Sequence, residues 1–350
     1  MESFRIGSKE IGRNKPCFVV AEMGLGHEGS LGAAYSFVDA AVDAGADAVK
    51  FQTHVAEAEG TERERFRKPM FPQDATRKDY WKRTAFSEEQ WRALKRHCDE
   101  RRILFLSSPF SIEAVRILQR VGVPAWKVPS GETNNTPLLE MLVQLEQPIL
   151  LSTGMSTFEE IQQAVRIVRT SKRDLLIYQC TNRYPCPPDQ IGLNMIQGFK
   201  DRFPNVPIGL SDHSGRICTG IAAFVLGAVS IEVHVTFSRK CFGPDVSASI
   251  TFEELKELVD SLRFLEIALH SPYDKDEQAG NLADVRALFT KSIVARTPIR
   301  AGTKITRDML AFKKPGNGIP AAAYREVVGK TLRSNIDADQ ELSWSNLKNE

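Results

Sequence analysis

Two histidines in the middle of the chain stand where a metal ion could bind. His213 and His234 each end a short run of alternating apolar residues, which is typical of a half-buried strand. Residues 215–227 carry apolar side chains at helical spacing, so the two strand ends are expected side by side in a parallel sheet. With Asp212 and Glu232 nearby, the two imidazoles could hold a divalent ion and leave positions open for a substrate.

Two histidines alone are an incomplete metal signature, so simple packing or solvation of either ring is the competing interpretation. Two lysines, Lys50 and Lys127, add a second kind of chemistry at the ends of strand-like runs. Ammonium groups and hydroxyls match the spread oxygens of a phosphate or carboxylate, which predicts an anion cradle. Its neutral donors would be Ser108, Ser130, Asn182 and Ser211.

Each lysine also has other interpretations. An exposed lysine at a strand end could form a surface ion pair of little energetic consequence. A buried lysine whose pKa were lowered could instead act as the Schiff-base nucleophile of an aldolase. The residues alone leave these alternatives open.

Eight strand-like segments alternate with helix-like segments over about 250 residues, the pattern of an α/β protein with a closed (β/α)8 TIM barrel. An open doubly wound sheet is the second choice, but no GxGxxG follows the first strand. In a barrel, chemistry collects at the carboxyl ends of the strands, where polar residues do cluster here. The predicted strands are 17–22, 48–53, 103–109, 125–130, 148–153, 176–181, 207–213 and 230–235.

Local signals mark where the intervening helices begin and end. Capping boxes are predicted at Ser87, Thr136, Thr157 and Thr251, each with Gln or Glu three or four residues later. Helix stops are expected at Gly45, Gly122 and Gly227. Before the first barrel strand, residues 4–6 and 9–11 flank Gly7-Ser8 and predict a short β-hairpin.

Two segments fall outside the barrel pattern. Residues 54–86 leave the second strand at the active end, and they are either a lid or a solvated insertion without a role. The composition changes near His270, and we predict a barrel domain over 1–272, a polar linker over 273–288 and a small β-rich module over 289–350. A module of that size is expected to gain stability by packing on something else.

Composition excludes several classes of protein. The chain has 46 Lys and Arg against 44 Asp and Glu, so no electrostatic attraction to nucleic acid or to an anionic membrane is expected. No apolar run reaches bilayer length, and the first residues lack a signal-peptide core. The six cysteines form no CxxC pair, which favours reduced thiols in a cytoplasmic protein.

Nine motifs, in chain order, carry a family resemblance: AEMGLGHEGS, KFQT, SSPF, KVPSGETNN, LSTGMS, QCTNRYP, IGLSDHS, EVH and GPD. Together they resemble the sialic acid synthase family, which makes nonulosonic acids. PIRAGTKITRDML and KKPGNG in turn resemble the SAF, or antifreeze-like, domain that these synthases carry. The resemblance implies a TIM barrel followed by a SAF domain, and condensation of phosphoenolpyruvate with an N-acetylated amino-hexose. It also implies a divalent metal, typically Mn²⁺, with Mg²⁺ or Co²⁺ as the other candidates.

The resemblance further assigns roles to residues of this chain. His213 and His234 would bind the metal, and Glu22 would be the general base. Phosphoenolpyruvate would be bound by Lys50, Ser108, Lys127, Ser130, Asn182 and Ser211. The sugar would face Gln52, Glu132, Tyr184, Asp245 and Lys314. A homodimer that exchanges its C-terminal modules would present Lys314 to the partner's barrel.

Three positions depart from the family pattern: Gly26 replaces an asparagine, Val233 a basic residue and Lys314 an arginine. The EVHVTFS–GPD segment resembles synthases for spore-coat or other surface polysaccharides. The acceptor is therefore expected to be N-acetylmannosamine or a diacetamido-trideoxyhexose. Two alternatives to a synthase are a Schiff-base aldolase on the same barrel and a degenerate homologue without activity.

Overall fold

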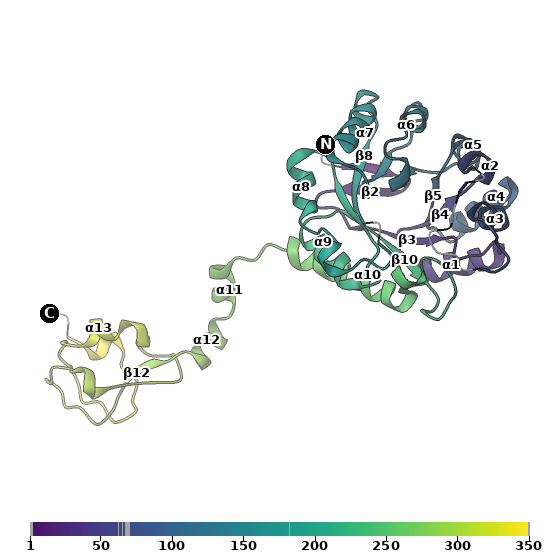
Figure 1. Cartoon of the computed structure of the whole chain (residues 1–350). Helices are drawn as coiled ribbons and strands as arrows, with labels where there is room; N and C mark the ends of the chain where they lie inside the picture. The colour runs from purple at the N-terminus through teal and green to yellow at the C-terminus, as the bar shows by residue number, and fades with distance from the viewer. Residues whose placement is uncertain (1–2, 62, 65, 67–70, 182, 349–350) are drawn as a thin grey trace. The chain divides into compact units, whose positions relative to one another are not determined.

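The computed structural model describes residues 3–348 except for 62, 65, 67–70 and 182. The chain divides into two compact units, Met1–His270 and Ser271–Glu350, and each is described by itself (Figure 1). In the described part of the chain, no helix combines the length and the apolar character that crossing a membrane requires.

Eight parallel strands form a barrel in the first unit, in which strands consecutive in the chain are neighbours and the last strand, β10, pairs with the first, β3. Strands β5 and β6, at the two ends of the hydrogen-bonded path, lie next to each other and close the ring. The structure thus confirms the predicted (β/α)8 barrel and excludes the open sheet. The strands are β3 (Phe18–Gly24), β4 (Ala48–Thr53), β5 (Leu104–Pro109), β6 (Trp126–Val128), β7 (Ile149–Ser152), β8 (Leu175–Cys180), β9 (Ile208–Asp212) and β10 (Ser230–Thr236).

One strand is much shorter than predicted. Residues 125–130 were expected to form it, but β6 ends at Val128 because Pro129 has no N–H for the ladder. Ser130 instead opens the 3₁₀ turn η1 (Ser130–Glu132). The other short elements of this unit are β11 (Ile250–Thr251), which pairs with β10, and the 3₁₀ turns η2 (Pro188–Gln190) and η3 (Val246–Ala248).

Helices surround the barrel and begin largely where the sequence predicts. Reciprocal capping bonds are present at Ser87 and Thr157, and Thr251 exchanges the same pair of bonds with Glu254. The box predicted at Thr136 is wrong, because the preceding Asn135 is the cap and accepts from the first turn. The helices are α1 (Leu31–Asp43), α4 (Glu88–Glu100), α5 (Ile112–Val121), α6 (Thr136–Leu142), α7 (Phe158–Thr170), α8 (Met195–Arg202), α9 (Ile217–Val225) and α10 (Phe252–His270).

The predicted helix stops are confirmed. Gly122 is the C-cap of α5 in the left-handed region, at a φ of 89°. Gly45 and Gly227 follow the caps of α1 and α9 and also have positive φ. A residue without a Cβ adopts this conformation without steric strain, so the chain can turn at once into the next strand.

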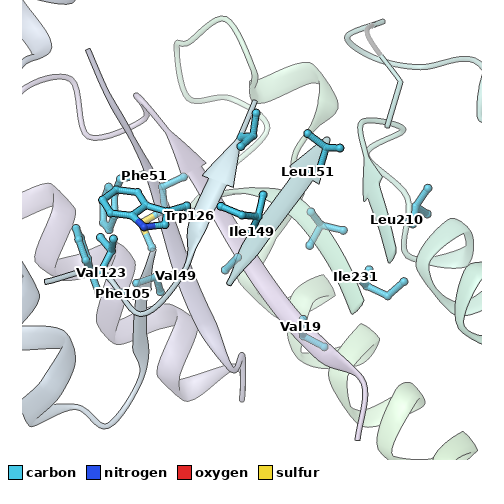
Figure 2. Packing of buried hydrophobic residues seen from close by; sticks show 14 of the residues in the cluster. Val19, Val49, Phe51, Phe105, Val123, Trp126, Ile149, Leu151, Leu210 and Ile231 are labelled. Carbon is cyan, nitrogen blue, oxygen red and sulfur yellow. The ribbon is translucent and has the colours of Figure 1, made fainter. Parts of the chain in front are cut away.

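Strand alternation builds two separate apolar cores. One set of strand residues packs with the helices, and Figure 2 shows Val49, Phe51, Phe105 and Trp126 gathered in that outer core. The alternate residues, among them Val20 and Leu106, form a second cluster inside the barrel. Side chains along a strand alternate between its two faces, so residues two positions apart lie on the same face.

The N-terminal hairpin contributes to the inner core. Strands β1 (Ser3–Ile6) and β2 (Lys9–Gly12) pair in antiparallel fashion, as predicted. Their residues Phe4, Ile6 and Ile11 are buried in the same cluster as the inward-facing barrel residues. The position of Gly7 against Leu104 and Pro124 puts the hairpin at the amino ends of the strands, opposite the expected site.

The segment after β4 has its own structure. It contains α2 (Ala56–Glu59) and α3 (Arg77–Thr84), and a capping box between Thr76 and Asp79 begins α3. Arg83 on α3 forms ion pairs with Glu28 in the loop after β3 and with Asp74. A small apolar cluster joins the same parts: Leu25, Ala56, Tyr80 and Trp81. These contacts anchor the segment to the mouth of the barrel.

The second unit has an apolar core of its own, which includes Ile293, Leu310 and Leu342. Strands β12 (Ser292–Ala295) and β13 (Leu310–Lys313) form an antiparallel pair within it. Residues predicted as a polar linker form helices α11 (Lys275–Asn281) and α12 (Ala283–Phe289). The remaining elements are α13 (Tyr324–Val327) and the 3₁₀ turns η4 (Arg307–Met309), η5 (Ala321–Ala323) and η6 (Trp344–Asn346).

Candidate active site

Strand register brings the predicted site residues together at the carboxyl end of the barrel. Glu22 on β3 lies opposite Lys50 on β4 and opposite His234 on β10. Glu232 on β10 lies opposite Ser211 on β9. All five residues are buried. The regular alternation of inward-facing residues along each strand therefore ends in a polar layer above the inner apolar core.

Two lysines and two carboxylates form the centre of this layer. Lys50 Nζ forms an ion pair with Glu22 Oε2 and lies 3.5 Å from Glu232 Oε1. Lys127 Nζ lies 2.7 Å from both carboxylate oxygens of Glu232, and 4.1 Å from the centre of the Tyr178 ring. Glu22 also accepts a hydrogen bond from Gly24 N at 2.7 Å. The four buried charges balance, as buried ions must if they are to remain ionised.

The electrostatics of this group hold Glu232 as an anion. Burial by itself would raise the pKa of its carboxyl, but the ammonium groups of Lys127 and Lys50 outweigh burial and lower it. Burial likewise opposes the charge on Lys50, and the carboxylates of Glu22 and Glu232 outweigh it and raise the pKa of that ammonium. The ammonium of Lys50 is thereby kept charged in a dry site, whereas burial outweighs the carboxylate of Glu232 at Lys127 and lowers the pKa of that ammonium.

Hydroxyl groups line the same cluster, as the sequence predicts. Ser108 Oγ accepts a hydrogen bond from Lys50 Nζ at 3.3 Å, and Ser211 Oγ donates to Glu232 Oε1 at 3.0 Å. Ser130 lies in the turn after β6 and donates to Cys180 Sγ at 3.4 Å. Asn182, the remaining predicted donor, lies outside the described residues.

The two histidines are adjacent. Their ring centres lie 5.3 Å apart, and Tyr184 stacks on His213 at 4.1 Å. His213 Nδ1 donates to the carbonyl oxygen of Thr181, so Nε2 carries the lone pair and accepts from the Tyr184 hydroxyl at 3.0 Å. Burial, with a smaller effect from His234, lowers the pKa of His213 to about 3.

These residues fit a divalent metal. A metal-binding imidazole is neutral and donates its second N–H to a carbonyl or carboxylate, which is the arrangement of His213. Across the described ranges, no three His, Cys, Asp or Glu side chains cluster closely enough to form a metal site by themselves. Two imidazoles with open coordination positions, rather than a closed structural site, are what the chain offers.

The predicted sugar-facing residues lie around this centre. A Cβ at Gly24, whose φ is 55°, would lie 3.0 Å from Asp245 Oδ2 and 3.6 Å from His234 Cε1, which places Asp245 beside the histidine. Glu132 is half-buried in η1 and accepts from Asn135 Nδ2 at 2.6 Å. Burial raises the pKa of this carboxyl.

Two further residues predicted to contact the sugar, Gln52 and Lys314, have other surroundings. Gln52 lies on β4 opposite Ser108 and contacts His54. Lys314 belongs to the C-terminal unit, where its ammonium lies 4.8 Å from the centre of the Phe289 ring.

Two of the three family departures have a structural explanation. A Cβ at Gly26 would lie 3.0 Å from Met23 O and 3.3 Å from the Phe37 ring, so Phe37 occupies space that a side chain at position 26 would need. Val233 is part of the outer core and faces the helices, on the opposite side of β10 from His234. It therefore cannot contact a metal at the histidines.

Sequence reasoning missed the central role of Glu232, which was considered only as a neighbour of the metal. The strand period contained the signal, because Glu232 shares the inward face of β10 with His234. The contacts of His54 with Gln52 and Glu59 were also missed, since His54 and Glu59 lie in the segment interpreted as a lid or an insertion.

Comparison with known proteins adds the family. The chain is 35% identical over 345 residues to the N-acetylneuraminate-9-phosphate synthase of Homo sapiens, which covers 95% of this chain and 93% of that protein. It is 34% identical over 350 residues to the N,N'-diacetyllegionaminic acid synthase of Legionella pneumophila, covering 98% of each. The crystal structure of the spore coat polysaccharide biosynthesis protein of Bacillus subtilis is similar with a TM-score of 0.66 and 28% identity, covering 99% of both chains.

Models of two families match the chain. Residues 290–348 match the SAF domain, in agreement with the resemblance of the C-terminal motifs. Residues 37–273 match the NeuB family, and that range contains most of the barrel and both histidines. With its lysine–carboxylate cluster beside a histidine pair at the barrel mouth, this chain belongs to the NeuB family of nonulosonic acid synthases.

Proposed function

We propose that this protein condenses phosphoenolpyruvate with an N-acetylated amino-hexose to form a nonulosonic acid and inorganic phosphate. The observation that carries the proposal is the buried pair Lys50 and Lys127 beside the two adjacent histidines. The lysines suit an anionic substrate, and the histidines suit a Lewis acid for a neutral carbonyl. The activities named for the human and Legionella relatives support the same class of product.

Residues of this chain are proposed to have the following binding roles. Lys50, Lys127 and the neighbouring hydroxyls hold the phosphate and carboxylate of phosphoenolpyruvate, since each ammonium has three donors. His213 and His234 would hold a divalent ion, with manganese as the first candidate and magnesium or cobalt as the others. When bound, such an ion supplies polarisation of the aldehyde oxygen of the open-chain sugar.

Water is the only further reactant that the bond changes need, and the proton that it loses balances the one that the new sugar alkoxide takes up. C3 of phosphoenolpyruvate attacks the aldehyde carbon, which forms the new C–C bond and leaves a cation at C2. Water adds at C2 and gives up a proton, for which Glu22 is the proposed base. The tetrahedral intermediate expels phosphate by cleavage of the C2–O bond. Glu22 lies beside Lys50, where the C2 end of the substrate would be held.

The sugar is proposed to be N-acetylmannosamine or a diacetamido-trideoxyhexose. The product name of the Legionella relative supports the diacetamido sugar, and that of the human relative, a 9-phosphate, supports the N-acetylneuraminate skeleton without fixing the phosphorylation of the acceptor. The likeness to the spore coat protein of Bacillus subtilis supports a role in surface polysaccharide synthesis, and a cytoplasmic location is part of the same proposal. Asp245, Glu132, Tyr184 and Gln52 would contact the acceptor.

A phosphate-release assay tests the function directly. Phosphoenolpyruvate would be incubated with a panel of acetamido sugars, with manganese and with a chelator. We expect phosphate release only when both the sugar and the metal are present. The absence of phosphate release with every sugar would refute the proposal and would support the degenerate homologue.

A Schiff-base aldolase is the second candidate, and one observation favours it: burial lowers the pKa of Lys127. Against it, the Lys127 ammonium already has two contacts with Glu232. Borohydride reduction in the presence of a keto acid separates the two functions. The aldolase would acquire a covalent label on one lysine, and the proposed synthase would acquire none.

Lys127→Met is expected to raise the KM for phosphoenolpyruvate by roughly 30-fold or more, because losing one partner of a buried charge contact costs about 2 kcal/mol or more. The KM for the sugar should change much less. Methionine keeps the aliphatic length, so packing is largely preserved. Steady-state kinetics with each substrate varied in turn measure both constants. A change confined to the sugar would show that the two subsites are wrongly assigned.

We also propose a homodimer in which the C-terminal unit of one chain completes the barrel site of the other. Lys314 would then act in the partner's site. Mixing inactive His213→Ala with inactive Lys314→Ala chains should restore activity, because each mixed dimer has one site with both residues intact. The experiment requires that Lys314→Ala be strongly impaired alone and that mixed dimers be verified by differential tags. Verified mixed dimers without activity would exclude the exchange.

A further inference from the structure

Three side chains, at the end of the second barrel strand and in the segment that follows it, form a continuous hydrogen-bonded chain. His54 Nε2 lies 3.3 Å from Gln52 Oε1, and His54 Nδ1 lies 2.7 Å and 2.9 Å from the two carboxyl oxygens of Glu59. The side chains of His54 and Glu59 are only 4% and 10% exposed. Gln52 is half-buried at the barrel mouth, where its strand register is shared with Ser108.

The imidazole at the centre of this chain is locked in place. Its ring stacks between Trp81 on α3, with centres 5.0 Å apart and planes at 11°, and Phe110, at 4.3 Å and 18°. An aromatic ring held between two others cannot rotate out of its plane without losing both contacts. The orientation of His54 is therefore fixed, and only the placement of its ring protons can change.

The acceptor on Gln52 determines where the protons lie. A carbonyl oxygen can only accept, so the contact with Gln52 Oε1 requires a proton on His54 Nε2. In a neutral imidazole Nδ1 is then bare, and the Glu59 carboxyl must be protonated in order to donate to it. This leaves the amide nitrogen of Gln52, with its two donors, on the side away from His54.

Burial favours this neutral arrangement over an ion pair between His54 and Glu59. Burial raises the pKa of Glu59 to about 8 and lowers the pKa of His54 to about 3. The other charged groups that act on Glu59 are Arg77 on α3, which lowers its pKa, and Glu64, which raises it. Those that act on His54 beside burial are Arg77, Glu22 and Asp245. Beside burial, the charge of Glu59 in turn raises the pKa of Glu132 in η1.

We propose that Glu59, acting through His54, positions Gln52 as a hydrogen-bond donor to the sugar, and that loss of the Glu59 proton reverses the amide. An acetamido carbonyl can only accept, so it needs the donor side of Gln52. When Glu59 ionises, it takes the His54 proton onto Nδ1, and the bare Nε2 then accepts from the amide nitrogen of Gln52. The oxygen of the amide is left facing the sugar. The inference rests on the proposed function and names Glu59 and His54 as positioning residues.

The sign of the pH effect follows from this exchange. Below about pH 8 Glu59 is protonated and Gln52 donates; above it Glu59 is ionised and Gln52 presents an acceptor. The KM for the sugar should therefore rise by about 3- to 10-fold between pH 7 and pH 9, the worth of one neutral hydrogen bond. The KM for phosphoenolpyruvate should not follow this change.

Glu59→Gln provides the decisive variant. Its amide nitrogen donates to His54 Nδ1 as the protonated carboxyl does, but it cannot ionise, so the sugar KM should become independent of pH from 7 to 9. Glu57→Gln is the matched control on the same helix, because Glu57 is exposed and pairs with Lys78 and Lys82. It should keep the pH profile of the natural protein. A flat profile in the natural protein, or an unchanged rise in Glu59→Gln, would overturn the proposal.

Nitrogen-15 NMR of the histidine rings gives a readout that needs no activity. The His54 ring, assigned by its absence in His54→Asn, should be protonated on Nε2 at pH 7 and on Nδ1 at pH 9. In Glu59→Gln it should stay protonated on Nε2. If the tautomer changes as expected while no acetamido sugar reacts, the relay stands and the proposed function is wrong. If sugars react but the ring is protonated on Nδ1 at pH 7, the relay is wrong and the function stands.

Discussion

His213→Ala and His234→Ala are each expected to lower kcat by roughly 1000-fold or more while leaving the fold intact. Each change removes one of the two imidazoles that would bind the proposed metal. Polarisation of the aldehyde is worth several kcal/mol of transition-state stabilisation, and about 4 kcal/mol corresponds to that factor. Phosphate release at saturating manganese measures the loss, and bound metal after dialysis should fall in parallel.

His97→Ala is the matched control for these variants. His97 is a partly exposed histidine on α4 that pairs with Asp39, away from the site, so its removal should leave activity and bound metal unchanged. Circular dichroism and thermal unfolding of all three variants check the fold. Full turnover in both site variants at saturating manganese would exclude the histidines as metal ligands.

Glu232→Ala is expected to destabilise the barrel by about 3–5 kcal/mol. It removes the carboxylate shared by Lys127 and Lys50, and breaking a buried pair leaves an uncompensated charge in a dry environment. Urea unfolding followed by tryptophan fluorescence measures the effect, because Trp126 is fully buried in the barrel wall. Glu232→Gln separates charge from packing, since it keeps the volume but removes the negative charge.

A double variant tests this explanation further. Adding Lys127→Met to Glu232→Ala leaves the Lys50–Glu22 pair balanced, so the double variant should be more stable than Glu232→Ala alone. A double variant whose destabilisation equals the sum of the two single effects would show that Lys127 and Glu232 are not energetically coupled.

The position of Val233 illustrates how far the family pattern could be taken without a structure. Val233 precedes a histidine that is predicted to bind a metal, and this suggested an effect on the site. The pleat of β10 turns it to the outer core instead, because successive side chains point to opposite faces. The same rule, applied two residues before His234, would have indicated Glu232 as an inward-facing group.

The hydrogen-bonded chain from Gln52 to Glu59 was beyond local reasoning for a different reason. His54 and Glu59 lie five residues apart, in a segment that has no strand or helix period to follow. Their role depends on Trp81 and Phe110, which reach the imidazole from two other parts of the chain. Stacking between distant residues leaves no periodic signal in the sequence.

The sequence by itself determined the barrel, because eight repeats of strand and helix patterns are local and several of them carry their own start or stop signals. It also determined which side chains end the strands, since the two-residue period is a property of every strand. Tertiary structure alone decided which of those side chains meet. Lys127 on β6 and Glu232 on β10 are 105 residues apart and on strands that are not neighbours, and they touch only because ring closure brings both ammonium and carboxylate into one dry interior.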